Sequence, residues 1–153
     1  MYFLRHAEAE EQGQGKADSE RALTAKGMRQ SVDVAKWATE HKVDARVVVT
    51  SPLLRARQTA EPVAAALKVP LVEDERLSGG RLTISALEGI VADQDDPEAI
   101  MIVGHEPDIS EILGELTGGR VAMKKAALAM VRCDRVADPC GELVWLTTAA
   151  GRK

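Results

Sequence analysis

Short apolar runs alternate with longer amphipathic segments along this chain of 153 residues, and this alternation constrains its fold more than any other feature. The runs within Arg46–Thr50 and Ala99–Val103 are apolar almost throughout, which is typical of strands buried on both faces of a parallel sheet. The amphipathic segments between the runs suit crossover helices that pack on such a sheet. The sequence therefore predicts one α/β domain over residues 1–153, built on a mostly parallel sheet.

The expected elements follow from apolar period and from residues that begin or end helices. Strands are expected at Met1–Arg5, Arg46–Thr50, Pro70–Val72, Ala99–Val103, Leu128–Cys133 and Glu142–Thr147. Helices are expected to begin at Thr24, Ser51, Thr83 and Pro107. The last two strands are joined by a short polar loop, which predicts a hairpin and therefore at least one antiparallel strand.

The sequence also predicts the core face of the first helix and a break in the second. In the first helix, the apolar period places Met28, Val32, Ala35 and Ala38 on the core face. In the second, Pro62 predicts a kink or a restart after Glu61, because proline lacks the amide proton that a helix interior needs.

Composition and charge exclude several classes of partner. Aromatic residues make up 3% of the chain, too few for a surface on which nucleic-acid bases stack. The formal net charge is −4, and the longest basic run is Lys124-Lys125, so no nucleic-acid or membrane partner is expected. There is neither a signal peptide nor an apolar stretch long enough to cross a membrane, so a cytoplasmic location is expected.

The two cysteines carry no recognisable metal or redox motif. Cys133 and Cys140 fit neither a zinc-ligand spacing nor a CxxC pair. In a cytoplasmic protein they are expected to be small buried or half-buried residues rather than a disulfide. No metal or other cofactor is expected.

Basic residues follow three of the predicted strands. Arg5-His6 closes the first strand, Arg55 follows the second in the segment from Ser51, and His105 closes the fourth. Ligands of open α/β sheets bind outside the carboxyl ends of the strands, so these side chains are expected to meet.

These residue types suit phosphoryl transfer. The planar guanidinium of arginine matches phosphate oxygens and stays charged, which stabilises the negative charge of a phosphoryl group in flight. A neutral imidazole can attack phosphorus and form a phosphoramidate that water then hydrolyses. Helix starts after Ser51 and Gly104 add backbone N–H donors for an anion. Each residue alone would fit an ordinary structural role. The hypothesis of phosphoryl transfer rests on their occurrence together at three strand ends.

Four segments resemble the signature blocks of the histidine phosphatase superfamily, which includes the phosphoglycerate mutases. The segments are Leu4–Glu8, Arg21–Gly27, Ser51–Ala60 and Val103–Pro107, in the order of the family. The residue after His6 is Ala7, where the family usually has glycine. The short chain lacks large inserted lobes and is similar to the SixA-type phosphohistidine phosphatases of bacteria.

The resemblance implies a fold and a set of roles. The fold would be a three-layer α/β/α sandwich with one antiparallel strand in a mixed sheet. His6 would be the nucleophile that forms a covalent phospho-His6 intermediate. The phosphoryl group would be stabilised by Arg5, Arg55 and His105, with further substrate contacts from Arg21, Ser51 and Glu106. A monomer acting on a phosphohistidine-bearing protein, such as a phosphorelay histidine domain, is expected.

The leaving group bears on the substrate. Phosphatases of alkyl esters need a carboxylic acid to protonate the leaving oxygen. The Gly-rich turn Ser78–Gly80, where such an acid is expected, contains no carboxyl group, so the candidates are Glu75 and Glu8. A phosphohistidine substrate relaxes this need, because an imidazole leaves more easily than an alkoxide.

Three alternatives stay open. The same machinery could hydrolyse small phosphate esters, or the chain could be a non-catalytic module that binds phosphorylated ligands. A metallohydrolase would use His6 and His105 with Asp108 or Glu106 as ligands. The adjacent Arg5 and Arg55 would repel a metal cation, and the spacing matches no metal-binding helix motif.

Overall fold

The computed structural model describes residues 1–136 and 141–149, which form a mixed α/β structure. The strands are β1 (Tyr2–Arg5), β2 (Val48–Thr50), β3 (Leu71–Glu73), β4 (Met101–Gly104), β5 (Leu128–Arg132) and β6 (Glu142–Thr147). The helices are α1 (Ala25–Glu40), α2 (Leu54–Leu67), α3 (Ile84–Asp93) and α4 (Asp108–Thr117). Two short 3₁₀ turns, η1 (Asp18–Glu20) and η2 (Glu75–Leu77), lie in the connections.

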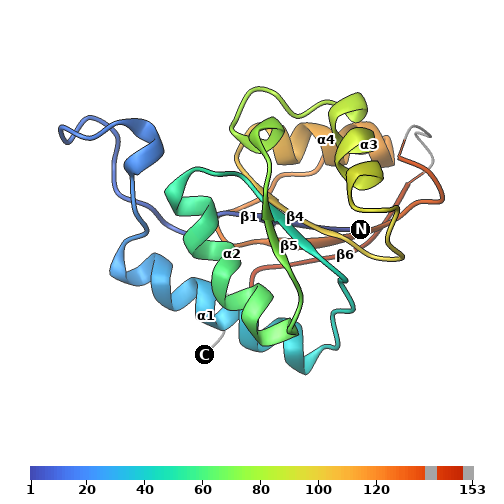
Figure 1. Cartoon of the computed structure of the whole chain (residues 1–153), viewed down its shortest axis with the longest axis horizontal. Coiled ribbons are helices and arrows are strands. Elements are labelled where there is room, and N and C mark those ends of the chain that lie inside the picture. Colours follow the sequence, from blue (N-terminus) through green and yellow to red (C-terminus); the bar gives the residue numbers. More distant parts are fainter. Residues whose placement is uncertain (137–140, 150–153) are drawn as a thin grey trace.

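The six strands form one sheet in the order β3-β2-β4-β1-β5-β6. The pairs β2–β3, β2–β4 and β1–β4 are parallel, whereas β5 is antiparallel to both β1 and β6. Figure 1 shows α1 and α2 on one side of the sheet and α3 and α4 on the other. The predicted three-layer sandwich with one antiparallel strand is confirmed.

Side-chain alternation along the strands fills a separate apolar core on each face of the sheet. In β1, Tyr2 and Leu4 pack with α1 and α2, whereas Phe3 packs with α3 and α4. The same alternation in β4 sends Met101 to the first core and Ile102 to the second. Because both faces are covered, the strands show the continuous apolar runs seen in the sequence.

The start of α2 differs from the prediction. The helix begins at Leu54, and Ser51 does not cap it. The Ser51 hydroxyl instead accepts a hydrogen bond from the Leu53 amide at 3.2 Å and contacts His105. Of the kink or restart predicted at Pro62, the restart does not occur, because α2 continues through Pro62 to Leu67.

The start of α1 was predicted correctly, and so was the burial of Ala35 and Ala38, but the other half of the predicted core face was wrong. The Thr24 hydroxyl caps the helix by accepting a hydrogen bond from the Gly27 amide at 3.0 Å. Met28 and Val32, expected in the core, are 45% and 58% exposed. The buried face is instead centred on small residues, namely Gly27, Ser31, Val34, Ala35 and Ala38.

A close approach between the backbones of α1 and of Glu8 explains which face of α1 is buried. A Cβ atom at Gly27 would lie 1.9 Å from the carbonyl oxygen of Glu8. Only glycine therefore lets α1 pack this tightly against the segment that follows β1.

The topology brings the three predicted clusters together. Arg5 pairs with Gly104 and Thr50 with Val103 across adjacent parallel strands, so β1, β4 and β2 end side by side. The residues that directly follow β1 and β2 are also hydrogen-bonded to β4. The His6 amide donates to Gly104 O at 3.0 Å, and the Ser51 amide donates to Val103 O at 3.0 Å. The candidate residues therefore share one edge of the sheet.

Two further expectations concern the rest of the chain. Cys133, directly after β5, is half-buried, and this burial raises the pKa of its thiol; Cys140 lies outside the described residues. Within residues 1–136 and 141–149, no helix has the length and apolar character needed to cross a membrane.

Candidate functional site

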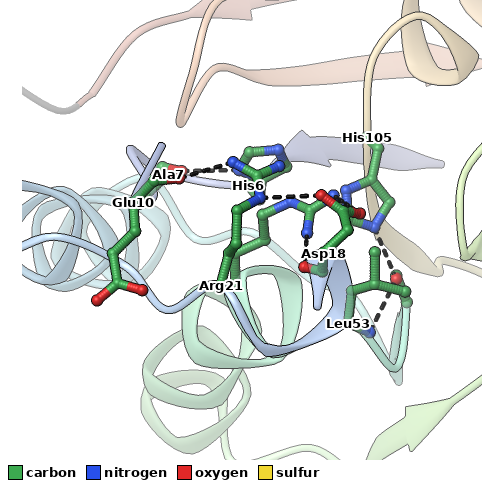
Figure 2. Close-up of polar contacts among 9 residues, drawn as sticks. His6, Ala7, Glu10, Asp18, Arg21, Leu53 and His105 are labelled. Atoms are coloured by element: carbon green, nitrogen blue, oxygen red, sulfur yellow. Dashed lines mark hydrogen bonds and ion pairs between the residues drawn. The ribbon is translucent and has the colours of Figure 1, made fainter. Parts of the chain in front are cut away.

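His6 lies at the carboxyl end of β1 with its ring almost fully buried. Its backbone amide donates to Gly104 O, and its carbonyl accepts from the Ala126 amide at 3.2 Å. The ring atom Nδ1 lies 2.7 Å from the Ala7 carbonyl oxygen (Figure 2). A carbonyl only accepts hydrogen bonds, so Nδ1 carries the proton and the lone pair of the neutral ring sits on Nε2. This tautomer leaves Nε2 available as a nucleophile.

His105 faces His6 from the end of β4. The two ring centroids are 5.2 Å apart, and the planes are tilted by 53°. The Nε2 atom of His105 lies 2.7 Å from Ser51 Oγ, which also accepts from the Leu53 amide. The Nδ1 atom is buried and has no hydrogen-bond partner among the described residues. An oxygen of a bound phosphoryl group could supply that partner.

Both imidazoles are held neutral. Burial, followed by the charges of nearby basic groups, lowers the pKa of His6 to about 3 and that of His105 to about 4. The lowering of the His6 pKa includes the effects of His105, Arg55 and Arg5, and outweighs the opposite effect of the Ala7 carbonyl. Desolvation and neighbouring cations both disfavour a protonated ring. At neutral pH, His6 is therefore unprotonated at Nε2.

Arg55, from the first turn of α2, is buried and bonded to the 3₁₀ turn η1. Its Nη1 donates to the Asp18 carbonyl oxygen at 2.9 Å and its Nη2 to Asp18 Oδ2 at 3.2 Å. The same carboxylate accepts from Arg21 Nε at 2.9 Å, and Arg21 Nη1 donates to the Glu10 carbonyl (Figure 2). Asp18 thus binds both Arg55, which was predicted to stabilise the phosphoryl group, and Arg21, which was predicted to contact the substrate.

Asp18 was absent from the sequence predictions. Partial burial by itself would raise the pKa of its carboxyl, but the hydrogen bond from Arg21 and the charge of Arg55 outweigh this and lower the pKa. Asp18 lies in a polar loop without helical or strand period, and its partner Arg55 is 37 residues away. The only local signal is its position three residues before Arg21, a common spacing for an ion pair.

Arg5 approaches the site from the end of β1. Its Nη1 donates to the Met123 carbonyl oxygen at 2.9 Å, while its buried Nε has no partner in the part of the chain described. Burial lowers the pKa of the guanidinium, and the nearby Glu106 opposes this change. Arg5, Arg55 and His105 thus all lie close enough to His6 to lower the pKa of its ring, and each has one buried nitrogen without a partner within the described residues.

The two candidate acids are engaged elsewhere. Glu8 accepts a hydrogen bond from the Thr24 hydroxyl at 3.1 Å and pairs with Lys26 at 3.3 Å. Glu75 is exposed in η2 and accepts from Ser78 at 2.9 Å. Within the described residues, neither carboxylate has a hydrogen bond or ion pair with the histidines or arginines of the site.

The carboxylates of the metal hypothesis also have other partners. Glu106 accepts from the backbone and side chain of Ser110, and Asp108 accepts from the amides of Arg81 and Leu82. Within residues 1–136 and 141–149, no cluster of three or more His, Cys, Asp or Glu side chains has the spacing to hold a metal ion.

Comparisons with known proteins agree on one family. The family model of the histidine phosphatase superfamily (branch 1) matches residues 1–82. An uncharacterized protein of Picosynechococcus sp. is 34% identical over 138 residues, which are 86% of this chain and 84% of that protein. The phosphohistidine phosphatase SixA of Escherichia coli K12 is 28% identical over 141 residues, covering 88% and 85% of the two chains.

A solved structure extends the similarity to three dimensions. The protein histidine phosphatase SixA complexed with tungstate superposes with a TM-score of 0.82 at 25% identity, covering 97% of this chain and 96% of that one. The matched region 1–82 contains Arg5, His6, Arg21 and Arg55, and the fold adds His105. This chain is therefore a phosphatase, and it belongs to the histidine phosphatase superfamily (branch 1).

Proposed function

We propose that this protein is a phosphohistidine phosphatase that removes the phosphoryl group from a histidine of another protein through a phospho-His6 intermediate. The observation that best supports this proposal is the state of the His6 ring. The ring is buried and neutral, and Ala7 fixes it in the tautomer with Nε2 free. Similarity to phosphatases named for phosphohistidine supports the substrate class.

In the first step, His6 Nε2 attacks phosphorus. A bond between Nε2 and phosphorus forms while the bond to the substrate imidazole breaks, and its electron pair returns to that imidazole. The substrate ring leaves neutral when its other nitrogen is already protonated. The charge on the equatorial oxygens is stabilised by Arg5, Arg55 and His105; Nε of each arginine and Nδ1 of His105 have no hydrogen-bond partner within the described residues.

In the second step, water attacks the phosphoryl group on His6. The phosphorylated ring keeps its Nδ1 proton and is cationic, so the hydrogen bond to Ala7 O stabilises it. When the phosphorus–nitrogen bond breaks, the electron pair returns to Nε2. Both protons of the water leave with the product as dihydrogen phosphate, and the neutral ring is regenerated.

The ionisation of Asp18 supports a P–N substrate over an alkyl ester. Asp18 is the carboxylate bonded directly to Arg55, but its lowered pKa keeps it ionised at neutral pH. An ionised carboxylate cannot protonate a leaving alkoxide. A leaving imidazole makes no such demand, so the site suits phosphohistidine.

The test is turnover of a defined phosphohistidine protein, such as a phosphorelay histidine domain phosphorylated with phosphoramidate. We expect wild type to release phosphate from this protein far faster than from sugar or nucleotide phosphates. His6→Ala should lose at least 1,000-fold in rate while keeping its circular dichroism spectrum, about the loss when a covalent nucleophile is removed. Acid-labile, base-stable label should appear on wild type only.

Two results would contradict the proposal. Turnover confined to small phosphate esters would reject the protein substrate and keep the phosphatase. Full activity of His6→Ala would reject the covalent intermediate.

A further inference from the structure

The segment between α4 and β5, here called the 119–127 loop, is hydrogen-bonded to the Arg5-His6 pair at three points. The Arg5 side chain donates from Nη1 to Met123 O at 2.9 Å, and the Arg5 amide donates to Ala127 O at 3.1 Å. The third bond runs from the Ala126 amide to His6 O at 3.2 Å. The position of the Arg5 guanidinium therefore depends on the conformation of this loop.

One side chain connects the 119–127 loop to the first turn of α4. The hydroxyl oxygen of Ser110 accepts a hydrogen bond from the Met123 amide at 3.0 Å. The same hydroxyl donates its proton to Glu106 Oε2, and the Ser110 amide donates to Glu106 Oε1 at 3.0 Å. A carboxylate only accepts hydrogen bonds, so the Ser110 hydroxyl donates its proton to Glu106. A lone pair of the same oxygen accepts the hydrogen bond from the Met123 amide.

Met123 is thus held on both sides of its Cα atom. Its amide is bonded to Ser110, and its carbonyl receives Nη1 of Arg5. Its side chain is buried in the core between the sheet and α4. Among the described residues, the Met123 carbonyl is the only hydrogen-bond partner of the Arg5 guanidinium.

The orientation of a guanidinium matters for phosphate. Its donors lie in one plane and match two phosphate oxygens only when that plane is correctly turned. A group with a single fixed hydrogen bond can rotate if that bond is released. Small rotations of a binding group cost a large part of its effect on a transition state.

We propose that Ser110 is a positioning residue, which fixes the Arg5 guanidinium through the backbone of Met123. Glu106 orients the Ser110 hydroxyl and so supports the position of Arg5, in addition to the direct effect of its charge on the guanidinium. This inference rests on the proposed function in one respect, since it takes Arg5 as a ligand of the phosphoryl group.

The first experiment measures binding of tungstate, a tetrahedral oxyanion, by calorimetry. Ser110→Ala removes the hydroxyl, and we expect tungstate to bind about 5- to 10-fold more weakly, the effect of one lost hydrogen bond. Ser110→Thr keeps the hydroxyl and should restore most of the affinity. Ser31→Ala is the matched control, because the Ser31 hydroxyl donates to Met28 O within α1 and lies outside the site. It should leave tungstate affinity unchanged.

A double-mutant cycle then separates positioning from a general structural effect. In an Arg5→Ala background, Ser110→Ala should weaken tungstate binding no further, since the group that it positions is gone. Additive losses would overturn the inference, as would wild-type affinity in Ser110→Ala. Equal thermal melting of Ser110→Ala and Ser31→Ala would show that the loss is not due to unfolding.

The binding assay also distinguishes this inference from the proposed function. If the cycle shows coupling but no phosphohistidine protein is turned over, the positioning role stands and the proposed substrate fails. If a phosphohistidine protein is turned over but the losses in the cycle are additive, the proposed function stands and the positioning role fails. A wild type that binds no tungstate would overturn the positioning role.

Discussion

Burial keeps the imidazoles of His6 and His105 neutral, and this makes the fold sensitive to acid. Their folded pKa values, about 3 and about 4, lie below the value of about 6.5 for an exposed histidine. The unfolded chain therefore binds more protons below about pH 6.5. Stability from these groups is fully present above that pH and is lost as pH falls towards the folded values.

We therefore expect the free energy of unfolding to fall by about 2 kcal/mol for each of the two histidines between pH 7 and pH 5. Urea denaturation at both pH values measures this change. In His105→Gln, about half of the pH dependence should disappear, because one of the two buried rings is gone. Identical pH dependence in wild type and His105→Gln would refute burial of a neutral ring as the cause.

Asp18 occupies donors of Arg55 that a phosphate would use. Replacing it with the isosteric asparagine removes a negative charge beside Arg55 and Arg21. We expect Asp18→Asn to bind tungstate several-fold more tightly at low salt, because repulsion of the anion is reduced. Asp33→Asn makes the same change in net charge at an exposed position of α1 and should have little effect. Equal affinities in both variants would argue against competition for Arg55.

The proximity of the candidate site residues could be predicted from the sequence, because strand ends locate them. Arg5, His6 and His105 directly follow or close apolar runs, and parallel strands bring such positions together. The Asp18 contact could not be predicted, because a loop without period carries no information about which distant side chain it meets.

At the scale of elements, helix starts set by local bonds were easier to predict than helix faces. Thr24 and Thr83 cap α1 and α3, since a capping hydroxyl needs only an amide three residues ahead. Ser51 has the same local preference, but its hydroxyl is used by Leu53 and His105. The face of α1 depended on a backbone contact at Gly27 that no apolar period reports.

Gly27 offers a test in which two effects have opposite signs. Glycine to alanine within a helix usually stabilises it by up to about 1 kcal/mol. In α1, the added Cβ would lie 1.9 Å from Glu8 O, so we expect Gly27→Ala to destabilise the protein by about 1–3 kcal/mol. Urea denaturation measures it, with Gly119→Ala as a control, since a Cβ there meets only the Thr117 hydroxyl at 3.6 Å. A stabilised Gly27→Ala would mean that the close approach is absent.

At the scale of the whole molecule, we expect residues 1–153 to unfold as one cooperative unit. One sheet contains all six strands and contributes side chains to both apolar cores, so neither core can lose its strands alone. The tryptophans, Trp37 and Trp145, both pack against the core between the sheet and α1–α2, so their fluorescence reports that side. Its urea transition should coincide with that of far-ultraviolet circular dichroism. Two separated midpoints would indicate independent units.

The place of β1 in the sheet has a consequence for amide hydrogen exchange. β1 lies between β4 and β5, and its amides alternate between the two neighbours, with the His6 amide bonded to Gly104 O and the Arg5 amide to Ala127 O. We therefore expect the amides of Arg5 and His6 to be among the slowest to exchange. Asp18 and Arg21 lie in and directly after η1, outside the ladders of the sheet. Under the proposed function, we expect His6 to attack the phosphoryl group from this rigid strand, and the loop that carries Asp18 and Arg21 to be the part of the site that adjusts to the substrate.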